Sequence, residues 1–279
     1  MDAAQLASGK GHRDENFPVA SMLLKPAHRA PVLAFYRFAR AADDISDHES
    51  ASSEEKLRLL GLMRSGLDGD PAGAGEALAL REVMAERGLD PIHAHDLLDA
   101  FVRDVTVNRY QDWDGLIGYC RLSAMPVGRY VLDVHGENRA CWPASDALCA
   151  ALQVINHLQD CGKDYRGLDR VYIPAESFAA TGARIDDLGA SRATPALRAA
   201  IASLVTRTRA LLGESAGFAA MIADRRLAAE VAIIQRLAVS LCGRLESRDP
   251  LSERVHHRPY EAAFLAAGAA VGSLFRRAA

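Results

Sequence analysis

Two pairs of aspartates, each with the spacing D-x-x-x-D, stand directly after mainly apolar stretches of the chain. Asp43 and Asp47 follow the stretch 35–39, and Asp160 and Asp164 follow the stretch 152–155. Residues four apart share one face of an α-helix, so each pair presents two carboxylates on the same side. A carboxylate among apolar side chains needs a cation or hydrogen-bond donors. The pattern therefore predicts helices whose clustered acids hold a cation.

The second pair extends into a longer strip of oxygen-bearing side chains. Asn156 lies one helical turn before Asp160, and Gln153 lies another turn back. Ligand sets made only of oxygen suit Mg²⁺, which usually also binds waters and substrate phosphate oxygens. Two acid-lined helices that face each other are expected to hold Mg²⁺ between them, with a diphosphate as the bridging ligand.

The plainer interpretation of such a motif is a solvated helix face. One D-x-x-x-D spacing is expected by chance about once in a chain of this length. Two of them in apolar surroundings favour a metal site. Arg40 before the first pair, and Lys163 and Arg166 beside the second, suit a bound phosphate, although a single arginine is more often part of a surface ion pair.

The rest of the sequence predicts an all-α protein. Apolar residues recur at helical spacing, and the alternation typical of strands is scarce. Gly- and Pro-rich loops separate the expected helices, and none resembles an interdomain linker, so we expect one domain over residues 1–279. Pro126 is expected to kink the fifth helix. The expected helices cover residues 31–40 and on into the first acidic pair, 54–66, 76–87, 92–107, 113–134, 144–163, 195–213, 218–246 and 260–275.

Composition narrows the classes of function. The net charge is −3, which gives no overall basic field to attract nucleic acid. The five cysteines form no C-x-x-C pair, which indicates reduced thiols and a cytoplasmic protein. The polar N-terminus lacks the apolar core of a signal peptide, and no apolar run approaches the ~20 residues that span a bilayer.

Several stretches together resemble the squalene/phytoene synthase family. The resemblance follows the chain in order and covers nearly all of it. The paired acidic motifs, with Gln-x-x-Asn before the second, are specific to that family. The matching stretches are NF at 16–17, LLKP at 23–26, FYRFARAADDISD at 35–47, YC at 119–120, Gly128, QVINHLQDCGKD at 153–164, RVYIP at 170–174 and LSERV at 251–255.

A narrower set of stretches is similar to the bacterial hydroxysqualene synthases of hopanoid biosynthesis. These are ENFPVAS at 15–21, YCRLSAMPVGR at 119–129 and NHLQD at 156–160. The resemblance implies the all-α isoprenoid synthase fold, a helical bundle with a central active-site cavity. It also implies Mg²⁺-dependent conversion of presqualene diphosphate to hydroxysqualene and diphosphate. Two alternatives stay open: synthesis of presqualene diphosphate or phytoene from two prenyl diphosphates, and a non-catalytic assembly factor.

The resemblance also implies roles for individual residues. Tyr119 matches a catalytic tyrosine of the family. The implied metal ligands are Asp43, Asp47, Asn156, Asp160 and Asp164, and the four aspartates among them also count as catalytic. The implied substrate-binding residues are Asn16, Phe17, Tyr36, Arg40, Gln153, Tyr172 and Arg254. The residue that positions the water stays open among Tyr119, Gln159 and Ser123.

Two positions depart from the broader family. Gln159 stands where many relatives carry arginine, and Asp249 lies where some carry tyrosine, so both changes are expected to remove a diphosphate contact. Because the implied substrate is a C30 lipid, we also expect peripheral contact with the inner membrane face. Other enzymes of the pathway are possible partners.

Overall fold

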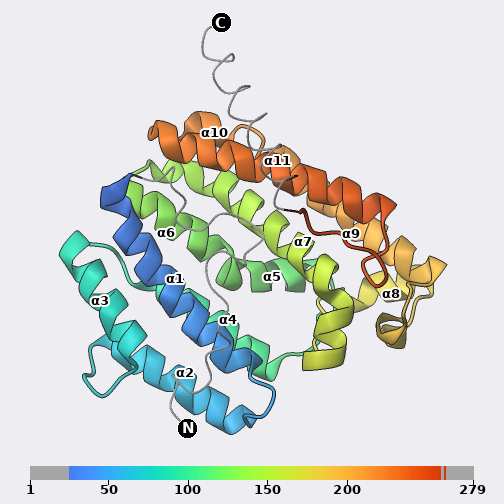
Figure 1. Ribbon diagram of the computed structural model, residues 1–279, viewed down its shortest axis with the longest axis horizontal. Coiled ribbons are helices and arrows are strands. Elements are labelled where there is room, and N and C mark those ends of the chain that lie inside the picture. Colours follow the sequence, from blue (N-terminus) through green and yellow to red (C-terminus); the bar gives the residue numbers. More distant parts are fainter. Residues whose placement is uncertain (1–24, 259–260, 262–279) are drawn as a thin grey trace, which may run out of the picture. The chain divides into compact units, whose positions relative to one another are not determined.

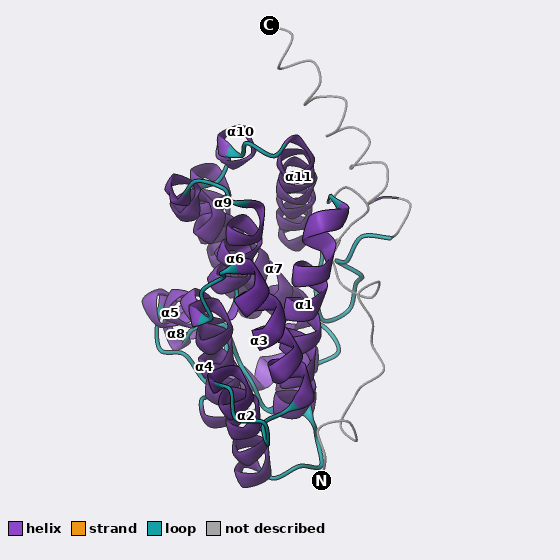
Figure 2. Ribbon diagram, turned by 90° about the vertical axis from the view of Figure 1, so that its left-hand side faces the viewer, coloured by secondary structure: helices purple, strands orange, loops and turns teal. Residues whose placement is uncertain are grey.

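The computed structural model describes residues 25–258 and residue 261, and within these residues the protein is built from helices (Figure 1). Short loops join them, and the single β-bridge in this part pairs Arg109 with Val171 (Figure 2). No helix in the described part is both long and apolar enough to cross a bilayer. The all-α prediction is confirmed.

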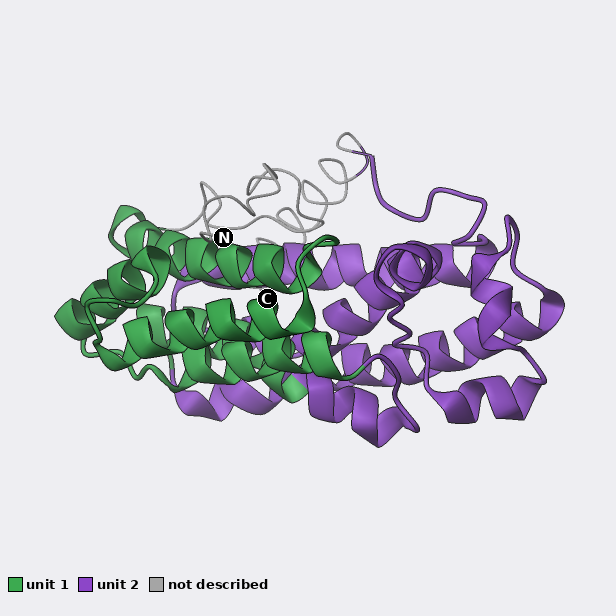
Figure 3. Cartoon of the chain, turned by 90° about the horizontal axis from the view of Figure 1, so that it is seen from below, with its two compact units in different colours: residues 1–107, 121–137 green, residues 108–120, 138–279 purple. Residues whose placement is uncertain are grey.

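The described chain divides into two compact units (Figure 3). Unit 1 contains residues up to 107 and residues 121–137, and unit 2 contains residues 108–120 and those from 138 onward. One domain over the whole chain stays a prediction.

Unit 1 is organised around α1, which packs against α2, α3, α4 and α6. Its buried side chains include Phe38, Ile45, Met63, Leu80 and Leu98. The helices are α1 (Pro26–Asp47), α2 (Ser53–Asp68), α3 (Gly75–Arg87), α4 (Ile92–Thr106) and α6 (Met125–His135).

A proline inside α1 is accommodated by side chains from other helices. Pro31 has no backbone N–H, so the carbonyl of Ala27 lacks its helical partner. The Arg87 guanidinium donates to that carbonyl at 2.7 Å. The Tyr130 hydroxyl donates to the Pro31 carbonyl at 3.2 Å, and its ring stacks on Phe35 with centroids 4.1 Å apart. These contacts keep α1 continuous up to the first acidic motif.

Unit 2 is organised around the long helix α7, which packs against α9 and α11. The last three residues of α5 belong to unit 1. The elements are α5 (Trp113–Ser123), the 3-10 helices η2 (Arg139–Cys141) and η3 (Ile185–Gly189), α7 (Trp142–Leu168), α8 (Ala175–Thr181), α9 (Pro195–Glu214), α10 (Phe218–Met221) and α11 (Arg225–Ser247).

Three sequence expectations differ from the structure. The helix expected over 113–134 is broken at Ala124, because Pro126 in the first turn of α6 starts a new helix instead of kinking one. The helix expected over 218–246 is two helices, and the Asp224 side chain caps the second by accepting from Arg226 N at 2.9 Å. Helix α8 was not expected. The helix expected over 260–275 lies outside the described residues.

Asp249 organises the turn after α11. Its side chain accepts hydrogen bonds from Ala193 N, Leu251 N and the Ser252 hydroxyl, each at 2.9 Å. Burial opposes ionisation, but these donors outweigh it and lower the pKa of Asp249. The residue therefore holds the chain that follows α11 against the loop before α9.

We expect Asp249→Asn to lower the free energy of unfolding by about 1–3 kcal/mol at pH 7, because an amide nitrogen then faces a backbone donor. A lowered pKa stabilises the fold above the ordinary aspartate pKa, and this stability is lost as the pH falls through the pKa of the folded state. The difference between variant and wild type should therefore shrink in acid. Urea titrations across pH measure it, with exposed Asp114→Asn as the control; equal stability of wild type and Asp249→Asn at pH 7 would contradict the role.

Candidate functional site

The first acidic motif occupies the end of α1 in unit 1. Tyr36, Arg40, Asp43 and Asp47 follow one another at helical spacing, and each is half-buried. Arg40 pairs with Asp43 at 2.9 Å and with Asp44 at 2.6 Å. The ion-pair interpretation of this arginine is thus correct for the protein without substrate.

The carboxyl of Asp43 is strongly perturbed. Although 36% of its side-chain surface is exposed, the carboxyl is enclosed by packed atoms. Desolvation, then the charge of Asp47, and further Asp44 and Asp104, raise the pKa of Asp43 to about 7, against the opposing effect of Arg40. The single positive charge of Arg40 therefore does not compensate for burial and for the neighbouring carboxylates around Asp43. Asp104, buried on α4, is a member of this acidic group that the sequence did not reveal, because only packing brings α4 beside α1.

The second acidic motif lies on α7 in unit 2. Gln153, Asn156, Asp160 and Asp164 are all half-buried, whereas the residues between them are mostly buried. They form the predicted strip of amide and carboxylate oxygens along one helix face. Gln159 is 5% exposed and lies off this strip, within the packed side of the helix.

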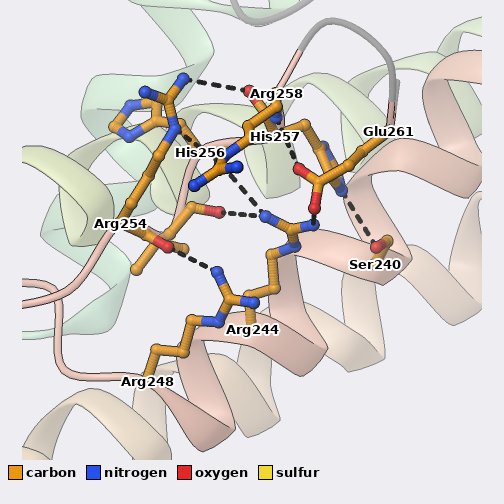
Figure 4. Close-up of polar contacts among 9 residues, drawn as sticks. Ser240, Arg244, Arg248, Arg254, His256, His257, Arg258 and Glu261 are labelled. Carbon is orange, nitrogen blue, oxygen red and sulfur yellow. Dashed lines mark hydrogen bonds and ion pairs between the residues drawn. The ribbon is translucent and has the colours of Figure 1, made fainter. Parts of the chain in front are cut away.

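The chain after α11 runs beside this motif. We call residues 249–258 the C-terminal strap. His256 Nε2 lies 3.7 Å from an Asp160 carboxylate oxygen, so the strap reaches the acidic strip. Arg244 on α11, and Arg248 directly after that helix, point at the strap and donate to its backbone carbonyls (Figure 4).

Arg254, expected to bind substrate, is held within the strap. Its Nε donates to the His256 carbonyl at 3.4 Å and its Nη2 to the His257 carbonyl at 3.3 Å. The side chain is exposed. The strap thus holds an exposed guanidinium two residues before His256, the residue that contacts Asp160.

Gly162 permits the strap to pack on α7. A Cβ atom at this position would lie 2.5 Å from Leu251 Cδ2 and 3.3 Å from the Leu188 carbonyl oxygen. Any larger residue would push the strap away from the segment between Asp160 and Asp164. The glycine of the motif is explained by this close approach.

Four rings form a buried aromatic group in unit 2. His157 stacks on Tyr172 with centroids 3.5 Å apart, and Tyr110 lies 5.8 Å from Tyr172 in a near-parallel orientation. Tyr119 is tilted against all three, at 5.8 Å from His157, 5.4 Å from Tyr172 and 5.6 Å from Tyr110. The structure thereby brings together Tyr119 and Tyr172, and it adds Tyr110 and His157.

Backbone pairing places two of these rings. Val171 N donates to the Asn108 carbonyl and Ala175 N to the Tyr110 carbonyl, both at 2.9 Å, so the two loop segments run together. Arg109 pairs with the Asp169 carboxylate at 2.5 Å. Burial, and then the nearby positive charge of Arg170, lower the pKa of His157 to about 3, so its imidazole is neutral at physiological pH.

Several other residues lie away from the two acidic motifs and the aromatic group, or outside the described part of the chain. Asn16 and Phe17 lie outside the described residues. Ser123 is half-buried at the end of α5. His93 is 2% exposed and pairs with Asp133 on α6 at 3.2 Å, because α4 packs against α6. Asp249 serves the turn described above.

The donor chemistry of both motifs fits a hard divalent cation. Burial first, and then the neighbouring carboxylates, raise the pKa of Asp43, so a bound cation would offset an unfavourable charge here. Carboxylate and amide oxygens are the groups that Mg²⁺ prefers. The facing arrangement of the two acidic helices stays a prediction, since the motifs lie in different units.

The chain is similar to known proteins over nearly its full length. A family model described as squalene/phytoene synthase matches residues 11–261. Hydroxysqualene synthase of Zymomonas mobilis subsp. mobilis is 55% identical over 277 residues, which are 99% of this chain and 93% of that protein. Hydroxysqualene synthase of Rhodopseudomonas palustris is 53% identical, over 99% of this chain and 94% of that protein.

Solved structures agree on the fold. The squalene synthase HpnC from Alicyclobacillus acidocaldarius is 30% identical, with a TM-score of 0.71 over 88% of this chain and 92% of that one. A dehydrosqualene synthase is 22% identical, with a TM-score of 0.77 over 99% of this chain and 97% of that one. The predicted isoprenoid synthase fold is confirmed.

We expect Gly162→Ala to lower the free energy of unfolding by roughly 1–3 kcal/mol, because the new methyl group overlaps Leu251. Shortening its neighbour should relieve the overlap, so Gly162→Ala should cost less in a Leu251→Ala background. A double-mutant cycle by urea denaturation measures this coupling. Equal costs in both backgrounds would show that the strap does not pack on Gly162 as described.

Proposed function

The chain belongs to the squalene/phytoene synthase family, and on that premise we propose that it is a hydroxysqualene synthase. It converts presqualene diphosphate and water to hydroxysqualene and diphosphate. The observation that carries this proposal is the identity of 48–55% to three proteins described as hydroxysqualene synthases, over 98–99% of this chain. The oxygen-lined helices and the buried aromatic group support it.

In this proposal Asp43 and Asp47 on α1, and Asn156, Asp160 and Asp164 on α7, hold Mg²⁺. Mg²⁺ supplies Lewis-acid stabilisation of the charge that develops on the diphosphate leaving group. The chain itself binds and orients the diphosphate through Arg40, Gln153 and Arg254, since guanidinium and amide groups donate to phosphate oxygens. Asn16 belongs to the same proposed set.

In this proposal the buried aromatic group stabilises the carbocation that forms when the diphosphate leaves. The ring faces of tyrosines stabilise positive charge, and a neutral imidazole beside them adds no opposing charge. Tyr119 is the proposed catalytic tyrosine, and Tyr172, with Tyr36 and Phe17, contacts the prenyl chain. The packed surroundings of Tyr119, which is 3% exposed, exclude bulk water from these rings.

Water capture distinguishes this reaction from a reductive one. We expect the purified protein with Mg²⁺ and presqualene diphosphate, without NADPH, to release diphosphate and form hydroxysqualene. In ¹⁸O-water the product should carry one ¹⁸O atom, as measured by mass spectrometry. A product whose oxygen is unlabelled, or a reaction that proceeds only with two farnesyl diphosphates, would overturn the proposed function.

The acidic motifs should be indispensable to turnover. We expect Asp43→Asn and Asp160→Asn each to reduce turnover by about 100-fold or more, because each removes a ligand charge. Asp114→Asn, exposed on α5, is the control. Near-normal turnover in both motif variants would remove these residues from the metal site.

Asp43→Asn should also stabilise the protein without metal. The folded protein binds the Asp43 proton more tightly than the unfolded chain does, since the pKa is raised to about 7. Wild-type stability therefore falls as the pH rises from the ordinary aspartate pKa to about 7, and the variant lacks this loss. Melting in EDTA at pH 8 tests it; a variant that melts below wild type would contradict the origin assigned to the shift.

Peripheral membrane contact is part of the proposal, through the surface formed by η2 and α10. Met221 is 46% exposed, and Cys141 Sγ donates to its carbonyl at 3.5 Å, which joins the two elements. The Arg139 guanidinium lies 4.7 Å from the centroid of the Trp142 ring, and Arg225 is exposed nearby. Apolar side chains flanked by arginines suit an anionic phospholipid surface.

We expect Met221→Glu to reduce cosedimentation with phosphatidylglycerol vesicles by several-fold, because it replaces an apolar contact with a repelled charge. Val239→Glu on α11 is the matched control, since Val239 is 42% exposed and lies outside this surface. Equal loss in both variants, or no vesicle binding by wild type, would reject this surface.

A further inference from the structure

The position of His157 is notable because it follows Asn156, a proposed metal ligand, yet turns away from the acidic strip. Its ring is 9% exposed and lies face to face with Tyr172, with an interplanar angle of 13°. Tyr110 is near-parallel to Tyr172 at 18°. Tyr172 is therefore the central ring of three near-parallel rings, and Tyr119 contacts each of them.

The other two rings of the stack are fixed by their backbones, whereas His157 is fixed by α7. Tyr110 and Tyr172 are held by the pairing of residues 108–111 with 171–176. His157 thus links the helix that carries Asn156 and Asp160 to Tyr119, whose ring lies 5.8 Å away within unit 2. Because the His157 ring stacks directly on Tyr172, a small displacement of α7 would move Tyr172 relative to Tyr119.

Stability alone does not explain a histidine at this position. Its Nε2 atom is buried and has no hydrogen-bond partner among the described residues. A buried nitrogen without a partner costs free energy of folding, and an apolar side chain of similar size would avoid that cost. A ring that stacks at 3.5 Å nevertheless occupies the site.

We propose that His157 is a positioning residue: its ring face holds Tyr172 and, through it, the catalytic Tyr119 in register with the metal-binding face of α7. This inference rests on the proposed function for the role of Tyr119. It predicts that a planar ring at position 157 is needed for the chemical step. The ring is not needed for folding, and its loss affects substrate binding less than the chemical step, because Tyr36 and Phe17 also contact the prenyl chain in the proposed function.

The test compares two substitutions in the full-length protein. His157→Leu removes the stack, and we expect kcat to fall about tenfold, the equivalent of one aromatic pair, while KM stays within about threefold of wild type. His157→Phe keeps a ring face, and we expect it to retain kcat within about threefold. Cys149→Ala, elsewhere on α7 and outside the ring group, is the control for general perturbation of the helix.

A second measurement does not depend on turnover. The near-ultraviolet circular dichroism of tyrosine reports ring packing, and we expect it to change in His157→Leu and to persist in His157→Phe. Both variants should melt within about 3 °C of wild type, because removal of the unpartnered nitrogen offsets lost stacking. Wild-type kcat and dichroism in His157→Leu would overturn the proposal, and so would equal loss in the two variants.

Failure of the proposed function gives a different result. If wild type releases no diphosphate from presqualene diphosphate, that function is rejected. The dichroism and melting comparison still decides whether His157 sets the tyrosine geometry.

Discussion

The structure depends on one constraint: the same helices must bury apolar side chains in the core and present carboxylates on another face. Residues 154, 155 and 158 of α7 are buried, while the strip from Gln153 to Asp164 is only half-buried. One helix therefore serves the core and the site together, and a rotation that improved one would damage the other. On α1 the same division raises the pKa of Asp43 to about 7, because its carboxyl is desolvated and lies beside the charge of Asp47.

The elements around α7 hold the C-terminal strap against this strip. The strap is tied to α11 by arginine donors, to the loop before α9 by Asp249, and to α7 by the absence of a side chain at Gly162. The first contact uses a backbone carbonyl of the strap, whereas the other two use the side chains of Asp249 and Leu251. This path places His256 Nε2 3.7 Å from Asp160 on α7.

The sequence predicted what depends on local periodicity, and it failed where tertiary packing decides. Most helix positions, and the placing of each acidic strip on one helix face, follow from spacing along one chain segment, and the described structure agrees with them. The break at Ala124 was expected only as a kink, because the spacing does not show that Pro126 starts a helix. Asp104 beside Asp43, and the stack of His157 on Tyr172, join segments distant in sequence, so no local pattern could reveal them.

The central claim is that both acidic motifs bind divalent cations together with a diphosphate. Electron paramagnetic resonance of Mn²⁺, titrated into the protein with and without inorganic diphosphate, tests it without turnover. The account predicts that diphosphate tightens Mn²⁺ binding by at least about tenfold in wild type, and that Asp43→Asn and Asp160→Asn each abolish this gain. Mn²⁺ binding that ignores diphosphate, or a gain that survives both substitutions, would contradict it.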